Sequence, residues 1–183
     1  MAAVALAVVA AAPAATSRDR PVRFRTLWRT SGEGTGKLPF TTGKPLTAAA
    51  VVWARNGEAA NTGPTFVSAA HVAALGRFPW RKRFVLAAAI VRPTTGFSIR
   101  VTRITYQRPT PEIEQFCVIA TISRPHAGQP VEQRRTVSAH VVQIARGSFG
   151  LAVPAAAILR SSNGELLAST TTFGPVRPGA CRA

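Results

Sequence analysis

Acidic residues and cysteines are scarce in this chain. Of 183 residues, seven are Asp or Glu, and Asp19 is the only aspartate. So few carboxylates argue against a paired acid/base catalytic site. Cys117 and Cys181 are too few for a disulfide framework and lack the CxxC spacing of metal or redox motifs. In an oxidising compartment the two are able to pair, which would close a long loop and contribute about 3–4 kcal/mol in the chain-entropy model.

Residues that usually mark an active or metal site occur here only in isolation. His71, His126 and His140 do not have the helical or hairpin spacing of metal ligands. The run Gly32–Lys37 (GEGTGK) has one residue too few between its outer glycines for a phosphate-binding loop, and Leu38 follows the lysine instead of Ser or Thr. No Gly-x-Ser-x-Gly nucleophile motif is present. We therefore expect no enzyme activity and no catalytic, cofactor or metal site.

The longest apolar stretch near the start, Met1–Ala15, is too short for a membrane-spanning helix, which needs about 20 residues. It ends in a small-x-small pattern suited to signal-peptide cleavage, although no basic residue precedes it. We expect a leader over residues 1–15 and a secreted, periplasmic or cell-envelope location. The rest predicts a single β-rich domain over residues 20–173, with its core in 78–146, and an irregular Pro/Gly-rich tail over 174–183.

Basic residues are abundant: 23 Lys and Arg give a formal net charge of +16, almost all from arginine. Such a charge suits a nucleic acid, an anionic surface or an acidic protein as partner. Because most arginines are scattered, an Arg- and Ala-rich background composition is the competing explanation. The densest run is Arg77–Arg83, where Trp80 is the best candidate for stacking on a single strand. Phe78, Trp80 and Phe84 also suit one buried strand face, with the arginine stems turned outward.

The stretch Phe84–Ile104 carries the clearest structural pattern. Phe84–Val91 is nearly all apolar, which predicts a strand buried on both faces, although its alanines also suit a helix. Phe97–Ile104 alternates between apolar and polar residues, which indicates a half-buried strand. Pro93 and Gly96 favour a tight turn between the two segments. We expect a β-hairpin here.

Short segments elsewhere predict further strands. In Val22–Thr30 the alternation places Trp28 on the same face as Phe24. Asn163-Gly164 is a strong turn signal between two short apolar segments. The other expected strands or strand approaches are Phe116–Ser123, Val131–Val137 and Ser138–Arg146, the last with Val142 and Ile144 inward and Gln143 outward.

Two segments before the core have helical features. Leu46–Arg55 predicts a short helix that packs Leu46, Ala50 and Trp53, although Val51-Val52-Trp53 suits a strand equally well. Phe66–Leu75 predicts a second short helix ended by Gly76. Gln107–Glu112 must turn because it contains two prolines. The fold class expected is mainly β, a β-sandwich or partly open barrel, with one or two short helices before the sheet core.

Four blocks carry a family resemblance across residues 78–146. They are PWRKRFVLAAAI, RPTTGFSIRVTRI, FCVIATISRPHAG and TVSAHVVQIAR, in that order. Together they resemble the C-terminal domain of the protease complex subunit PrcB, with Ala139 where that family usually has proline. The resemblance implies a secreted or envelope-associated domain without enzyme activity that stabilises or matures a partner protease. The family's motifs are structural, so they transfer no binding residues.

The turn RPTTGF also resembles the Pro-Thr-Thr-Gly loop of chagasin-type cysteine protease inhibitors, in which an exposed loop of a sandwich enters the enzyme's cleft. No second and third inhibitory loops are evident, although Ser123–Gly128 holds a comparable position. Our leading hypothesis is a binding domain for a protease or other envelope protein; a loop-insertion inhibitor and a non-specific nucleic-acid binder are the alternatives. The expected contact residues are Arg92, Pro93, Thr94, Thr95, Gly96 and Phe97.

Overall fold

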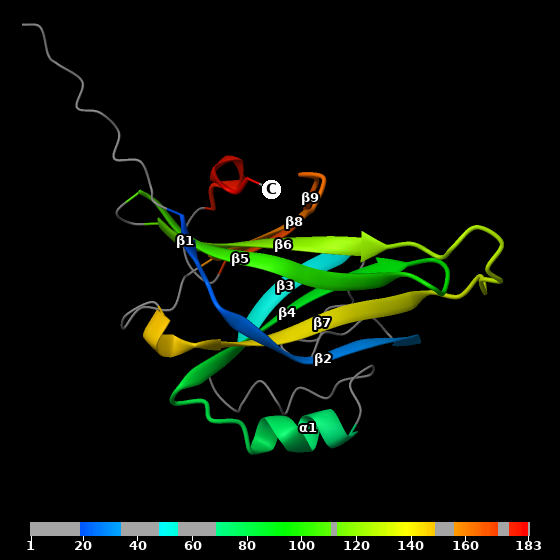
Figure 1. Ribbon diagram of the computed structural model, residues 1–183, viewed down its shortest axis with the longest axis horizontal. Helices are drawn as coiled ribbons and strands as arrows, with labels where there is room; N and C mark the ends of the chain where they lie inside the picture. Colours follow the sequence, from blue (N-terminus) through cyan, green and yellow to red (C-terminus); the bar gives the residue numbers. More distant parts are fainter. Residues whose placement is uncertain are drawn as a thin grey trace, which may run out of the picture.

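The computed structural model of the protein describes residues 19–33, 48–54, 69–110, 113–148, 156–171 and 176–182. Two sheets pack face to face in a mainly β fold (Figure 1), which confirms the predicted fold class. The leader predicted over residues 1–15 lies outside the described residues.

Sheet A has the strand order β1-β5-β6-β8-β9, and sheet B has the order β2-β7-β4-β3. All neighbouring strands are antiparallel except β6 and β8, which are parallel. The strands of sheet A are β1 (Arg20–Pro21), β5 (Ser98–Thr110), β6 (Ile113–Ser123), β8 (Ala156–Ser161) and β9 (Leu166–Thr171). Those of sheet B are β2 (Phe24–Glu33), β3 (Ala49–Ala54), β4 (Arg83–Arg92) and β7 (Thr136–Ala145). The helical elements are α1 (Ala69–Gly76) and the 3-10 turns η2 (Arg146–Ser148) and η3 (Pro178–Ala180).

The main core lies between the two sheets. Alternate side chains of β4 and β7 point into it from sheet B, and alternate side chains of β5, β6 and β8 point into it from sheet A. Phe84 stacks on Phe116 across the interface, with ring centroids 5.5 Å apart. The fully buried side chains at its centre include Phe84, Leu86, Ile99, Ile104, Phe116, Ile144 and Leu159.

The outer face of sheet B is also buried. Helix α1 and the segment that follows it cover this face (Figure 1), and Leu75, Phe78 and Trp80 pack against alternate residues of β4 and β7. This second layer explains why β4 is apolar at almost every position, because both of its faces are removed from water. The predicted double-sided burial of Phe84–Val91 is confirmed. The helix predicted over Phe66–Leu75 is confirmed for Ala69–Leu75, and residues 66–68 lie outside the described residues.

The predicted hairpin over Phe84–Ile104 is wrong. Strand β4 pairs with β3 and β7 in sheet B, whereas β5 pairs with β1 and β6 in sheet A. Residues Arg92–Phe97 therefore form an arch that crosses from one sheet to the other, and we call this segment the arch. The apolar pattern specified how each strand is buried, but not which strands are its neighbours. Pro93 and Gly96 serve an inter-sheet crossing as well as a hairpin turn.

The predicted helix over Leu46–Arg55 is also wrong, since Ala49–Ala54 forms the edge strand β3. The three alanines of β4, Ala87–Ala89, lie opposite Ala50, Val51 and Val52 of β3. Trp53 packs against the inter-sheet core and Val52 against the outer core, as expected for alternating strand positions. Strand pairing and two-sided packing of the β-branched residues outweigh the helical preference of alanine.

A bulge changes the expected faces of β2. The register with β7 shifts between Thr26 and Trp28, so Phe24 faces the inter-sheet core while Trp28 faces the outer core. The sequence placed the two aromatic side chains on one face because strict alternation assumes no extra residue. The strand also continues to Glu33, three residues beyond the predicted end.

The later strands agree with most sequence predictions. Strand β6 covers the expected segment, β7 buries Val142 and Ile144 in the inter-sheet core, and Asn163-Gly164 turns between β8 and β9. Gly164 has a φ of 86°, a conformation that favours glycine. Strand β5 continues through Pro109 to Thr110, with an irregular register against β6. Because Thr110 pairs with Ile113 of the antiparallel β6, the chain reverses within the predicted turn Gln107–Glu112, at its end.

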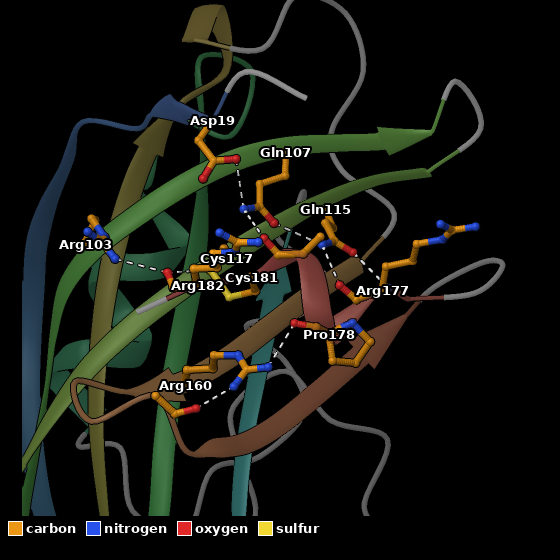
Figure 2. The surroundings of a disulfide bond; sticks show 12 residues. Asp19, Arg103, Gln107, Gln115, Cys117, Arg160, Arg177, Pro178, Cys181 and Arg182 are labelled. Carbon is orange, nitrogen blue, oxygen red and sulfur yellow. Dashed lines mark hydrogen bonds between the residues drawn. A yellow bond between two sulfur atoms is a disulfide. The ribbon is translucent and has the colours of Figure 1, made fainter. Parts of the chain in front are cut away.

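The tail lies on the outer face of sheet A, where a disulfide joins Cys181 to Cys117 of β6 with a Cα–Cα distance of 5.3 Å (Figure 2). Gln115 pairs with the backbone of Arg177 in both directions at 3.1 Å. Gln107 donates to the Ala180 carbonyl at 2.9 Å and accepts from Gln115 at 3.0 Å. Gln107 also donates to the Asp19 carboxylate at 3.0 Å, so the two buried amides bind both the tail and the residue before β1.

Candidate functional site

The arch stands at one end of the sandwich, beside the loop that joins β6 to β7 (Figure 1). Within it Pro93 and Gly96 are exposed, while the other four residues are half-buried. The Arg92 guanidinium lies 5.7 Å from the centre of the Phe97 ring, a cation–π contact. The ring itself packs against the inter-sheet core. The structure therefore brings all six predicted contact residues together at one end, and the arch is anchored by its last residue.

A row of polar side chains on β7 holds the arch from inside. Thr136, Ser138 and His140 all point toward the arch and the start of β5, and we call them the polar row. The Thr136 hydroxyl donates to the Thr94 carbonyl at 2.8 Å, and the Ser138 hydroxyl donates to the Phe97 carbonyl at 2.6 Å. Both residues are buried, with exposed fractions of 4% for Thr136 and 2% for Ser138. Because buried carbonyls need partners, the polar row fixes the path of the arch backbone.

The loop between β6 and β7 holds the arch from outside. The Thr95 amide donates to the Glu132 carbonyl at 3.1 Å, and the Glu132 amide donates to the Thr95 hydroxyl at 3.0 Å. Gly96 has a φ of 86°, and a Cβ at this position would lie 2.8 Å from Cγ of Pro125. Only glycine satisfies both the left-handed backbone and this close approach. The arch is thus a fixed surface feature rather than a free loop.

A polar hollow of about 600 Å³ opens beside the arch, and we call it the arch hollow. Three parts of the chain line it: the arch, the end of β6, and the turn between β8 and β9. Arg92 and Arg124 provide positive charge that exceeds the single negative charge of Glu165, while Ser162 and Asn163 provide neutral polar groups. The full lining is Arg92, Phe97, Ile122, Arg124, Ser161, Ser162, Asn163 and Glu165. Such a hollow suits a polar chain that carries negative charge.

His140 and Thr26 resemble a base and a nucleophile, because His140 Nε2 lies 2.9 Å from the Thr26 hydroxyl. The Val101 amide, however, donates to Nδ1 of the same ring at 2.8 Å. Nε2 must therefore carry the proton and donate it to Thr26, so the neutral ring is in the wrong tautomer to act as a base toward Thr26. Burial, with the nearby charges of Arg29 and Arg100, lowers the pKa of His140 to about 4. His140 thus has a structural role: it binds Thr26 within sheet B and joins sheet B to sheet A through the Val101 amide.

The other isolated candidate residues, His71 and Trp80, make packing contacts on the outer face of sheet B. His71 stacks on Trp28 with ring centroids 4.5 Å apart. Trp80 donates from its indole to the Leu75 carbonyl at 3.1 Å and packs on the outer core, as the core-packing alternative predicted. Phe84 faces the opposite side of sheet B, so the three aromatic residues do not share a face as expected. Within the described ranges, no three metal-ligating side chains cluster, and no helix could span a bilayer.

Sequence reasoning missed the polar row and most of the arch hollow. The signal for the polar row is the alternation of Thr136, Ser138 and His140 with Val137 and Ala139, which marks a strand with one polar face. These residues alternate in step with Val142 and Ile144, which the sequence placed inward, but no role was assigned to them; the row is buried against the arch and β5. Neither Arg124 nor Ser162 has a sequence feature of its own.

Comparison of this chain with protein-family models, with curated proteins and with solved structures found no match.

Proposed function

We propose that this chain is a secreted or envelope-associated binding domain without enzyme activity that associates with a partner protease and stabilises it. The proposal starts from the resemblance of residues 78–146 to the C-terminal domain of PrcB. The order of blocks that carries the resemblance corresponds in the structure to β4, the arch with β5, β6 and β7.

The observation that carries the proposal is the fixed position of the arch. Its backbone is held from inside by Thr136 and Ser138 and from outside by Glu132. A surface already held in its bound shape loses little conformational entropy on association, so more of the contact energy contributes to affinity. The side chains of Arg92 and Phe97 remain at the rim of the arch hollow.

The chemistry of the hollow indicates what the partner presents. Arginine is well suited to protein interfaces, because its planar guanidinium binds carboxylates in a bidentate manner. Arg92 is pre-oriented by its contact with the Phe97 ring, and Arg124 is an exposed residue that lines the same hollow. An acidic loop of the protease, entering between these two guanidiniums, is the partner that fits best.

Affinity capture from the culture fluid of the producing organism tests the proposal. The purified chain is expected to retain a secreted protease, and R92E/R124E is expected to lose it because both guanidiniums then repel the acidic loop. The matched control is R100E/R182E, which makes the same charge change at two exposed positions away from the arch hollow. Retention of the same protease by R92E/R124E, or of cytosolic proteins alone by the unmodified chain, would contradict the proposal.

A loop-insertion inhibitor is the second candidate, and one observation favours it. The segment Ser123–Gly128, whose position in the sequence is comparable to that of an inhibitory loop, contains Pro125, which approaches Gly96 of the arch. The Thr95 hydroxyl is already bonded to Glu132, which leaves less of the arch free to enter a cleft. Inhibition of papain by the unmodified chain, abolished in T94R/T95R, would support an inhibitor; a chain that leaves papain fully active would end this alternative.

Nucleic-acid binding stays a prediction, and no contact in the structure favours it over a protein partner. The candidate stacking residue Trp80 is half-buried against sheet B. Non-specific binding to a single strand should weaken steeply with salt, with a slope of about −0.7 per phosphate contacted. Gel-shift titrations across a range of salt concentrations distinguish this alternative, since a flat response would exclude it.

A further inference from the structure

A second hollow lies at the end of the sandwich away from the arch, where β2 and β4 begin and β7 ends. Its volume is about 580 Å³, within the usual range of roughly 300–1,000 Å³ for small-molecule sites. We call it the rear hollow. Its lining residues are Val22, Arg23, Phe24, Arg25, Arg83, Gln143 and Ala145.

The lining of the rear hollow combines apolar residues with three arginines. Val22 belongs to the inter-sheet core and Phe24 packs against it, so the hollow reaches the apolar interior at its base. Most of the lining surface is apolar, in contrast to the arch hollow, whose lining is mostly polar. An apolar ligand body placed there would cover exposed core surface and be removed from water.

Three arginines surround this apolar surface. Arg25 lies opposite Gln143 in the β2–β7 pair, and the Arg83 guanidinium donates to the Gln143 side-chain oxygen at 2.6 Å. Gln143 therefore holds Arg83 in place without neutralising its charge. Among the described residues, no carboxylate forms an ion pair with Arg23, Arg25 or Arg83. Positive charge without a counter-charge, next to exposed apolar surface, is complementary to one class of ligand.

We propose that the rear hollow binds a single anionic amphiphile of the fatty-acid type. The acyl chain lies on Val22, Phe24 and Ala145, and the carboxylate accepts hydrogen bonds from Arg25 and Arg83. A free amphiphile fits better than a membrane surface, because the apolar groups line a hollow instead of projecting from the fold. This inference is independent of the proposed protease partner, whose contact lies at the arch end.

Isothermal titration calorimetry with decanoate, below its micelle concentration, tests the inference on the full chain. Decanoate is expected to bind at one site, and R25Q/R83Q is expected to weaken it about tenfold or more, because two charge-assisted hydrogen bonds are lost. A145W is expected to abolish binding by filling the hollow. Decanol, which lacks the charge, and acetate, which lacks the chain, should both bind at least about tenfold more weakly than decanoate.

Two matched controls accompany these variants. R100Q/R182Q removes the same charge from exposed positions outside the hollow, and A74W adds the same bulk on the exposed side of α1. Both should bind decanoate as the unmodified chain does. The inference is overturned if decanoate does not bind, if R25Q/R83Q and A145W bind it unchanged, or if the chain binds only phosphatidylglycerol vesicles. None of these outcomes depends on the protease partner, whose capture R25Q/R83Q should leave intact.

Discussion

The arch and the tail are both irregular segments packed on the sandwich, but different bonds hold them. The tail is fixed by the Cys117–Cys181 disulfide and by the buried amides of Gln107 and Gln115. The arch has no covalent link and is held by hydrogen bonds to its backbone and by the close approach of Gly96 to Pro125. At the tail, the side-chain amides of Gln107 and Gln115 are already bonded to the tail backbone. In the arch, backbone groups provide attachment and side chains remain available for a partner.

Removing the disulfide should have the largest effect on stability and should leave the structure of the arch unchanged. The C117A/C181A variant is expected to lose about 3–4 kcal/mol of unfolding free energy, because the unfolded chain is no longer closed over a separation of 64 residues. Urea denaturation measures this loss, with the reduced unmodified chain as control. Protease capture should survive under native conditions. Loss of capture in a variant that is still folded would show that the two segments are coupled.

Replacing His140 should have the next largest effect, because this residue anchors the strand that follows the arch. The His140→Leu variant leaves the buried Val101 amide without its acceptor, at a cost of about 1–3 kcal/mol at neutral pH. Chemical denaturation at pH 7.5 measures the loss. The Thr26→Val variant removes only the second, more exposed partner of the ring and should cost less.

His140 should also make stability depend on pH. Its folded pKa of about 4 is below the value of about 6.5 expected in the unfolded chain, so the unfolded state takes up a proton first as the pH falls. The contribution is therefore complete above about pH 6.5 and is lost toward pH 4, a change of about 2–3 kcal/mol. Unfolding free energies at pH 7.5 and 4.5 should differ more for the unmodified chain than for His140→Leu. Equal differences would contradict the assigned tautomer and burial.

A pair of glycine substitutions separates backbone strain from the close approach in the arch. Gly96 and Gly128 have similar φ values of 86° and 81°, but only Gly96 has a neighbour within 4 Å of the added Cβ. Gly128→Ala is expected to cost about 1 kcal/mol from backbone strain alone, and Gly96→Ala about 2 kcal/mol or more. Thermal unfolding measures both. Equal losses would mean that Pro125 moves aside without cost and that the arch is not fixed there.

The smallest expected effect concerns a single hydroxyl of the polar row. Thr136→Val keeps the shape of the side chain but removes the hydrogen bond to the Thr94 carbonyl, at a cost of about 1 kcal/mol. Thr121→Val, at an exposed position of β6, should change the unfolding free energy by less than about 0.5 kcal/mol. The amide of Thr95 should also exchange faster in Thr136→Val, which NMR measures directly. Unchanged exchange would remove Thr136 from the set of groups that hold the arch.

The sequence predicted which faces of the strands are buried better than it predicted which strands pair with one another. The continuous apolar run in β4 and the alternation in β5 correctly indicated how many faces of each strand are covered. Neither pattern specifies pairing partners, so two consecutive strands were assigned to one hairpin although they lie in different sheets. The bulge in β2 also escaped prediction, because it depends on the register with β7.

The candidate site was predicted only in part. Pro93 and Gly96 indicated a turn at the arch in the sequence, because proline fixes its own φ angle and glycine allows a positive φ. Arg124 follows β6 and Ser162 follows β8, and both residues line the same hollow because β6 and β8 pair in parallel. The local sequence does not specify such long-range pairing. The polar row was missed because its function depends on backbone groups of the arch and β5, which come from another part of the chain.

Hydrogen–deuterium exchange of the chain, alone and with the captured protease, is the most direct test of binding through the arch end. The account predicts slower exchange on binding in residues 92–97 and 124–132, with no change at residues 22–25 and 143–145 at the opposite end. Slower exchange at the opposite end, with residues 92–97 unaffected, would contradict it.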